Sequence, residues 1–238
     1  MRQPPNILTL LTTIFLTGML ALNAQADTLR MALRSMPPGN ANPHTSGGWP
    51  PLLIWPALFE PLTAIGEDGA LGPLLATSWH HENETTWIFE LRDNILFSNG
   101  EPLNAAAAAA TINYLLSDEG RTFSAYRELR TVASASARNR LTLEVKTTQP
   151  DSMIPGRLAG VRILPPQYFA DVGPETFALE PHGTGPFMVE RWKTGRASLI
   201  KNPNAWRPAQ VDRIEYTAAP DSTARIQALI SDAVDIAF

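Results

Sequence analysis

Residues 212–238 read DRIEYTAAPDSTARIQALISDAVDIAF, and this stretch decides the fold class. Asp212–Thr217 predicts a strand, Asp221 is a good N-cap for a helix that runs to Ile230, and Ala233–Phe238 predicts a second strand. A strand, a helix and a strand in this order form a βαβ unit, which places two parallel strands in one sheet. We therefore expect an α/β fold. The helix carries three apolar side chains at the spacing of a buried face: Ile226, Leu229 and Ile230.

The region upstream contributes both strands and helices. Thr86–Arg92 alternates apolar and polar residues, which predicts a half-buried strand. Ala105–Leu116 begins with six alanines, and this composition predicts a helix with Asn104 as its N-cap. We expect Gly120 to stop that helix. Further strands are expected at Thr28–Leu33, Val132–Ala135, Arg140–Lys146, Phe187–Trp192 and Ala197–Lys201, and further helical segments at Leu52–Phe59 and Gln167–Val172.

Composition excludes several classes of protein. The 238 residues include 19 Lys+Arg and 23 Asp+Glu, which gives a formal charge of −4 and offers no basic surface for nucleic acid. The absence of cysteine excludes disulfides, thiolate metal sites, a cysteine nucleophile and a lipidated N-terminal cysteine. At 44% hydrophobic residues, the chain has enough apolar material to build a core.

The N-terminus predicts export. Arg2 precedes the apolar run Ile7–Leu22, and Ala24-Gln25-Ala26 then supplies the small residues that signal peptidase requires. The run is shorter than the roughly 20 apolar residues of a spanning helix, so a cleavable signal peptide at residues 1–26 is favoured over a membrane anchor. Without a cysteine at the cleavage site, the mature protein is expected to be free in a Gram-negative periplasm and not a lipoprotein.

The residues that could carry chemistry indicate no catalytic or metal site. His80-His81-Glu82 is the one local cluster of metal-ligand types, but neighbouring residues of a strand point to opposite faces. Gly183-Thr184-Gly185 lacks the remaining residues of a phosphate-binding loop, so we expect a tight turn before a strand. Trp49, in an irregular loop after the first strand, is a candidate for lining a ligand cleft. No catalytic residues, metal ligands or cofactor are predicted.

Seven short stretches follow one another in a recognisable order. They are Asn42–His44, Leu58–Leu62, Leu74–Trp79, Thr86–Arg92, Phe97–Pro102, Gly183–Phe187 and Ala228–Ile236. In this order they resemble the solute-binding proteins of the peptide/nickel class of ABC importers, bacterial extracellular family 5. The resemblance covers nearly all of the chain after residue 26.

The resemblance implies a type II periplasmic-binding-protein fold (cluster C), in which two lobes close on a ligand. The chain is expected to cover the first lobe, with the second lobe missing and Phe238 ending a fragment. By this mapping, residues 27–59 plus 162–238 form the α/β core of the first lobe. Residues 60–161 form an extra α+β subdomain.

The resemblance also implies a binding site. In oligopeptide-binding relatives, the extended backbone after the Asn/Asp-Pro-His element pairs with the peptide main chain, and the matching positions here are Ser46, Gly47, Gly48 and Trp49. Tyr126 stands where the nickel-binding branch has a tryptophan. Two positions where that branch has arginines hold other residues, namely Phe123 and Ala159.

The expected function is therefore a monomeric periplasmic component of an ABC importer that binds di- or oligopeptides and delivers them to the membrane permease. It is not expected to be an enzyme. A nickel- or metal-chelate-binding importer component is the alternative within the family. An exported hydrolase is the alternative from another class, although the sequence indicates no pairing of nucleophile and base. A chain with half of the clamp could also fail to close on any ligand.

Overall fold

The structure is a computed structural model that describes residues 27–38, 40–45 and 51–238. The predicted signal peptide lies outside the described residues. The helices are α2 (Pro51–Leu58), α3 (Ala105–Leu116), α4 (Ile154–Arg157), α5 (Pro166–Phe177) and α6 (Ser222–Ile230), with 3₁₀ turns η1 (Gly120–Thr122), η2 (Ser124–Leu129) and η3 (Leu158–Gly160). The strands are β1 (Thr28–Leu33), β2 (Thr63–Ile65), β3 (Leu71–Pro73), β4 (Ala76–Asn83), β5 (Thr86–Leu91), β6 (Val132–Ala137), β7 (Thr142–Thr147), β8 (Phe187–Lys193), β9 (Arg196–Lys201), β10 (Arg213–Ala218) and β11 (Ile236–Ala237).

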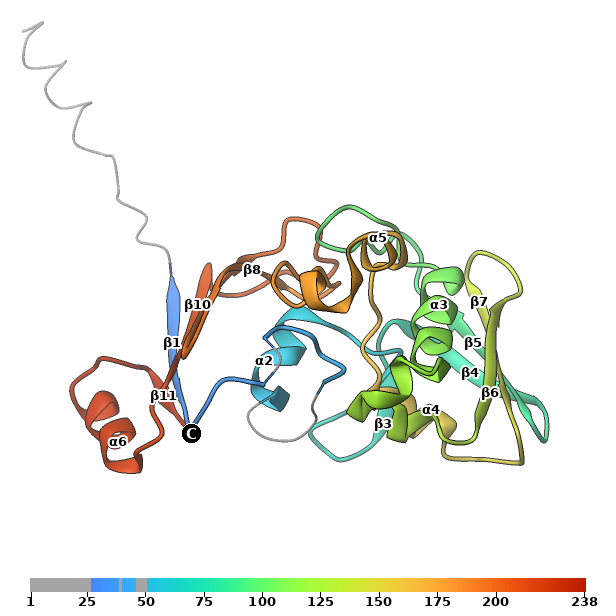
Figure 1. Cartoon of the computed structure of the whole chain (residues 1–238), viewed down its shortest axis with the longest axis horizontal. Helices are drawn as coiled ribbons and strands as arrows, with labels where there is room; N and C mark the ends of the chain where they lie inside the picture. Colours follow the sequence, from blue (N-terminus) through green and yellow to red (C-terminus); the bar gives the residue numbers. More distant parts are fainter. Residues whose placement is uncertain (1–26, 39, 46–50) are drawn as a thin grey trace, which may run out of the picture.

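One end of the elongated molecule is a five-stranded sheet with the order β11-β1-β10-β9-β8 (Figure 1). Strand β1 runs parallel to both β10 and β11 and separates them, so the predicted parallel crossover is confirmed with the first strand inserted between its two partners. Strands β8, β9 and β10 are antiparallel, and the β8–β9 turn contains Gly195 at a φ of 75°. That positive φ is readily accessible to glycine, as the sequence predicted.

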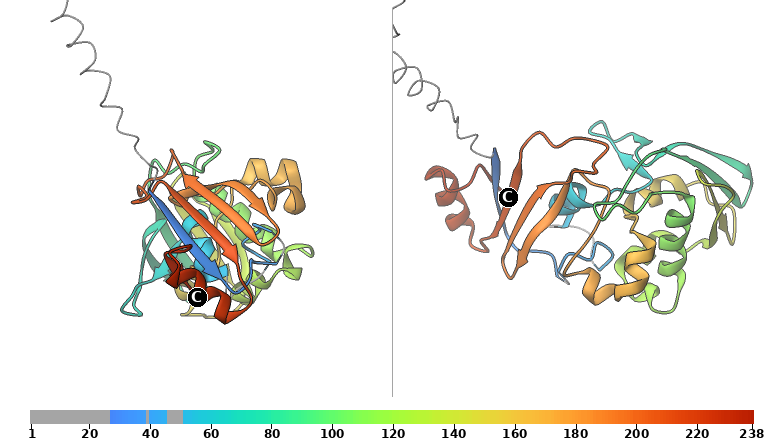
Figure 2. Two further views of the ribbon diagram at one scale, coloured as in Figure 1. Left: turned by 90° about the vertical axis from the view of Figure 1, so that its left-hand side faces the viewer. Right: turned by 90° about the horizontal axis from the view of Figure 1, so that it is seen from above.

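Helix α2 covers one face of this sheet, and its aromatic side chains order the core. Trp55 stacks on Trp192 of β8 with ring centroids 6.1 Å apart, and it meets Phe59 edge-on at 5.9 Å. The Tyr216 hydroxyl of β10 donates to the Leu53 carbonyl of α2. The opposite face of the sheet is turned to the viewer in the left-hand view of Figure 2.

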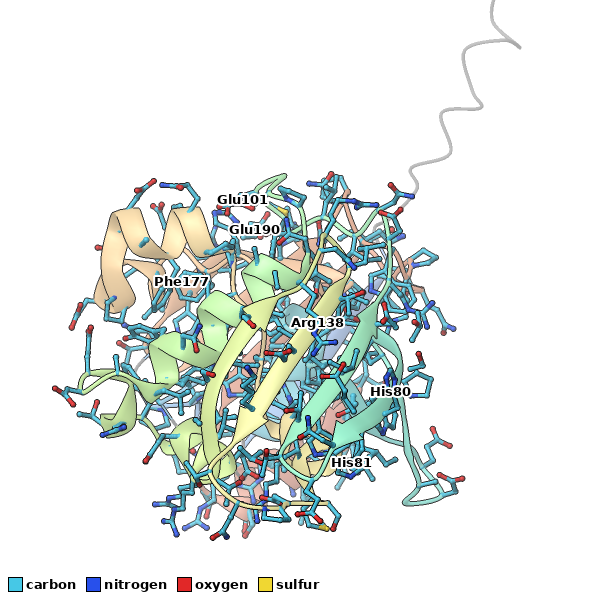
Figure 3. The ribbon with its side chains drawn as sticks, turned by 90° about the vertical axis from the view of Figure 1, so that its right-hand side faces the viewer. His80, His81, Glu101, Arg138, Phe177 and Glu190 are labelled. Atoms are coloured by element: carbon cyan, nitrogen blue, oxygen red, sulfur yellow. The ribbon has the colours of Figure 1, made fainter. Side chains whose placement is uncertain are left out.

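The other end of the molecule is an antiparallel four-stranded sheet with the order β4-β5-β7-β6. Helix α3 packs against it, and the buried alanines of α3 allow a close approach to the sheet. The Asn104 side chain accepts a hydrogen bond from the Ala107 amide, so the predicted helix bounds and N-cap are both confirmed. On the outer face, Arg138 donates to the carboxylates of Glu82 and Glu144 (Figure 3).

The buried side chains form two clusters. One runs from Leu62 to Ile163 and includes the four-stranded sheet and α3. The other combines residues between Met31 and Phe59 with residues between Leu164 and Tyr216. This distribution supports a core of residues 27–59 plus 162–238 and a subdomain of residues 60–161, a division that stays a proposal. None of the described helices is long and apolar enough to span a bilayer.

The predicted burial of one face of α6 is wrong. Ile226, Leu229 and Ile230 are 55%, 43% and 71% exposed. The helix instead turns the side of Arg225 and Ala228 inward, where both residues are half-buried and Arg225 donates to the carbonyls of Ala219 and Pro220. Apolar spacing identifies a helix face, but it does not tell which face meets the sheet.

Of two expectations about glycines, the helix stop at Gly120 is wrong, whereas the turn before β8 is present as a bend at residues 184–186. Helix α3 ends at Leu116 with Ser117 as its C-cap, before Gly120 is reached. Gly183 and Gly185 are not among the described residues with positive φ. Both positions require glycine because the backbone of α2 leaves no room for a side chain. A Cβ would lie 2.0 Å from the Leu58 carbonyl oxygen at Gly183 and 2.5 Å from the Ala57 carbonyl oxygen at Gly185.

Candidate ligand-binding site

Four of the predicted site residues, Ser46, Gly47, Gly48 and Trp49, lie outside the described residues. Tyr126 is in η2, where it packs against the cluster of the four-stranded sheet. The Arg121 guanidinium lies 5.7 Å from the centroid of its ring. The ligand-binding role of all five residues stays a prediction.

The predicted Asn-Pro-His element holds three distant segments together. The Asn42 side chain accepts from the His44 amide, which fixes the turn. His44 is buried, and its carbonyl accepts from the Ser124 hydroxyl at 3.1 Å and the Ala125 amide at 3.3 Å. Its Nε2 lies 2.9 Å from the Arg162 carbonyl oxygen, so Nε2 carries the proton and donates. The loop after β1, the turn η2 and residue 162 therefore meet at one place.

A cavity of about 260 Å³ opens beside this junction. Trp55 of α2 lines it, and so do Glu128 of η2, Gly160 of η3 and Arg162. Trp55 belongs to one buried cluster and Ala125, which also lines the cavity, belongs to the other, so the cavity lies where the two clusters meet. A hollow at such a junction is a usual place for a small-molecule site.

Arg162 is the unusual residue of this cavity. Its Nη1 donates to the Ala159 carbonyl at 2.7 Å, whereas its Nε is buried without a hydrogen-bond partner among the described residues. None of the ion pairs of the described chain includes it. Burial lowers the pKa of Arg162 to about 10, so the guanidinium is charged at neutral pH. An uncompensated positive charge therefore lines the cavity.

Two other buried polar groups near this place also lack partners. The Nε1 of Trp55, another cavity residue, has no acceptor among the described residues. The Nδ1 of His44 has no donor in the same set. Burial lowers the pKa of His44 to about 4, and the charge of Arg162 acts in the same direction. His44 is thus neutral near pH 7 and adds no second charge.

Glu128 gives the cavity a carboxylate. It forms no ion pair in the described chain, so it does not neutralise Arg162 directly. A Cβ at Gly160 would lie 3.0 Å from the Glu128 Cγ, so the glycine gives this side chain room. A cation and an anion of this kind, in one cavity and unpaired with each other, suit a ligand with both charges.

The histidines of β4 and a second cavity are less suited to hold a charged solute. His80 and His81 lie on the edge strand β4 (Figure 3), and the His81 ring packs against Trp87. The described residues contain no group of three metal-ligand side chains. A second cavity, of about 280 Å³ between α3 and α5, is mainly apolar and is lined by no cation.

The structure brings together one serine and one histidine that the sequence did not pair. The Ser98 hydroxyl lies 2.9 Å from the His182 Nδ1. The Ser98 amide also donates to the Gly183 carbonyl, so this contact fastens the Phe97–Pro102 turn to the glycine segment. Neither residue lines the two cavities described above.

Sequence reasoning also missed Arg162. Its side-chain partner Ala159 is only three residues away, but His44, which binds its carbonyl, is 118 residues distant. The available signal was a charged residue inside the apolar stretch Leu158–Leu164. A charge in such a stretch has to find a partner or a function.

Comparisons with curated proteins find relatives that bind different solutes. The nickel-binding periplasmic protein of Escherichia coli K12 is 31% identical over 189 residues, which are 76% of this chain and 36% of that protein. A putative ABC transporter peptide-binding protein of Brucella ovis is 28% identical over 213 residues, 84% of this chain and 39% of that protein. The chain spans little more than a third of the length of these relatives.

Solved structures show the same fold. OppA of Burkholderia pseudomallei matches with a TM-score of 0.81 at 21% identity, over 90% of this chain and 46% of that one. NikA of Brucella suis, in complex with Fe(III)-EDTA, matches with a TM-score of 0.75 at 25% identity, over 87% of this chain and 42% of that one. The predicted type II periplasmic-binding-protein fold is confirmed, and the match extends to less than half of each solved chain.

The family follows from the sequence match. A model described as bacterial extracellular solute-binding proteins, family 5 Middle, matches residues 70–238, which is most of the chain. The chain belongs to the bacterial extracellular solute-binding proteins of family 5.

Proposed function

We propose that this chain is part of the periplasmic substrate-binding component of an ABC importer, and that it binds di- or oligopeptides for delivery to the membrane permease. One observation carries the proposal: the cavity of about 260 Å³ is lined by Arg162, a buried cation without a counter-ion among the described residues. A receptor for a charged solute has a reason to keep such a group, because the ligand supplies the missing partner.

The charges of the cavity favour a peptide. A short peptide carries a carboxylate and an ammonium group, and the cavity offers the guanidinium of Arg162 and the carboxylate of Glu128. The peptide-binding relative of Brucella ovis supports the same choice, since its match extends over 84% of this chain. Permease subunits are the partners that this role requires.

A metal chelate is the second candidate. It is favoured by the nickel-binding relative, which at 31% has a higher identity than the peptide-binding one. Carboxylates of a chelator could also meet Arg162, but a chelate with net negative charge would be repelled by Glu128. The two candidates therefore differ in the charge that they bring to Glu128.

Thermal unfolding of the full chain with added ligands tests both proposals. Short dipeptides at millimolar concentration are expected to raise the Tm, because a ligand that binds only the native state stabilises it. The matched arms contain nickel with histidine, nickel alone and histidine alone. If only the nickel–histidine arm raises the Tm, the chelate proposal replaces the peptide proposal. If no arm does so while the protein is folded by circular dichroism, both are wrong.

A second readout addresses the hydrolase alternative. Dipeptides and a generic ester are incubated with the protein, and their products are measured by mass spectrometry. Binding without turnover supports the receptor role. Turnover that is lost in Ser98→Ala would instead indicate that the Ser98–His182 pair is catalytic.

A further inference from the structure

We propose that Arg162 receives a free carboxylate of the ligand, and that the cavity therefore selects solutes with a carboxylate over neutral analogues of the same shape. The inference rests on the proposed solute-binding function and adds the chemical group that is recognised. It concerns a residue that the resemblance to the family did not indicate.

The first argument is the state of the guanidinium without ligand. A buried charge is normally paired, because desolvation costs several kcal/mol when nothing compensates it. Burial alone lowers the pKa of Arg162, and no carboxylate of the described chain opposes this effect. The charge of Arg162 therefore lowers the stability of the ligand-free protein. Met, Leu or Gln would fill a similar volume without this desolvation penalty.

The second argument is the number of N–H donors that have no partner in the described chain. Guanidinium has five N–H donors in a rigid fork that fits the two oxygens of a carboxylate. The Ala159 carbonyl takes one of these donors, from Nη1. The Nε donor has no partner in the described chain. A second unpartnered donor, Trp55 Nε1, belongs to the same cavity.

The third argument concerns the other charges around the cavity. Arg127 also lines it, but its side chain is exposed and already solvated. Glu128 forms no ion pair with Arg162, and His44 is neutral. The buried positive charge therefore remains available to a carboxylate, while Arg34, which is exposed and does not line the cavity, offers an arginine for control variants.

The test is a calorimetric titration with one pair of probes: the dipeptide Ala-Phe and its C-terminal amide. The wild-type protein is expected to bind the acid roughly 10 to 100 times more tightly than the amide, which is the usual range for loss of a charge-assisted hydrogen bond. Arg162→Gln is expected to bind both probes equally weakly. Arg34→Gln, at an exposed arginine that does not line the cavity, is expected to keep the wild-type preference for the acid.

The outcomes separate this inference from the proposed function. If the wild-type protein binds acid and amide equally well, it is a peptide receptor and the carboxylate inference is wrong. If Arg162→Gln keeps the preference for the acid, another residue receives the carboxylate. If the folded wild-type protein binds neither probe, the peptide proposal itself fails.

A second variant guards against a folding defect. Arg162→Lys keeps the charge but lacks the planar fork, so a preference for the acid that is smaller than in the wild type is expected. Thermal unfolding checks each variant for a cooperative transition. A folded lysine variant with no preference for the acid would support recognition by the planar fork of the guanidinium. A preference equal to that of the wild type would show that charge alone suffices and would overturn the role given to the fork.

Discussion

Replacing Arg162 by methionine is expected to make the ligand-free protein more stable. Burial lowers the pKa of Arg162 to about 10. An ordinary arginine titrates about two to three pKa units higher, and one unit corresponds to about 1.4 kcal/mol, so keeping the charge destabilises the native state by roughly 3 kcal/mol. Methionine has a similar length and no charge, so it removes this penalty.

The loss of one hydrogen bond offsets part of this gain in stability. The hydrogen bond from Nη1 to the Ala159 carbonyl disappears in Arg162→Met, and a bond of this kind contributes about 1 kcal/mol. The net gain is then about 1 to 2 kcal/mol. For a chain of this size, that corresponds to a rise in Tm of roughly 2 to 8 °C. A stabilising substitution at a binding residue is the usual trade between stability and function.

Differential scanning calorimetry at pH 7 without ligand measures the effect. The matched control is Arg127→Met, because Arg127 lines the same cavity but is exposed, and its Tm is expected to change little. The reasoning is refuted if Arg162→Met loses 1 kcal/mol or more of stability while Arg127→Met does not. Arg162 would then be held by the protein itself and would not await a ligand.

Three further substitutions test the supporting structure. Burial lowers the pKa of His44 to about 4, whereas the unfolded chain takes up this proton near pH 6.5, so the free energy of unfolding falls as the pH drops from 6.5 to 4. In His44→Gln, pH-dependent thermal unfolding should show a fall that is smaller by up to about 3 kcal/mol. An equal fall in the two proteins would contradict the lowered pKa of His44. The buried Glu60 carboxylate accepts hydrogen bonds from Trp206 Nε1 at 2.7 Å and from Arg207. Glu60→Ala should therefore lower the free energy of unfolding in urea by about 2 to 4 kcal/mol. A loss below 1 kcal/mol would show that these bonds contribute little to stability. Gly185→Ala would place a Cβ 2.5 Å from a backbone oxygen of α2, so it should strongly lower the urea concentration at the midpoint of unfolding. An unchanged midpoint would mean that α2 shifts away at little cost.

Local sequence signals predicted the elements whose ends are set by neighbouring residues. The helix Ala105–Leu116 and the strand Thr28–Leu33 have the predicted bounds, because capping, helix propensity and apolar alternation act within a few residues. The inward face of α6 was not predicted correctly. Arg225 and Ala228 lie on that face, whereas the apolar spacing of the helix points to Ile226, Leu229 and Ile230.

The candidate site depends on contacts between residues that are far apart in the chain. His44, Trp55 and Arg162 carry no common motif, and they meet only after the loop following β1 has packed against η2 and residue 162. The sequence of Asn42–His44 indicates only the resemblance to family 5. Its role in joining the loop after β1 to η2 and residue 162 depends on the fold. The two glycines of the Gly183–Gly185 segment predict a turn, but their close contact with α2 depends on residues more than 120 positions earlier in the chain.

Hydrogen–deuterium exchange with and without the dipeptide Ala-Phe tests most directly whether the Arg162 cavity is the ligand site. The account predicts slower exchange at residues 124–129 and 158–162 when the dipeptide is bound, because these segments line the cavity. Exchange around the second cavity, at residues 110–119 and 166–174, should not change. Protection of the second cavity, or binding without protection at residues 158–162, would contradict the assignment of the site.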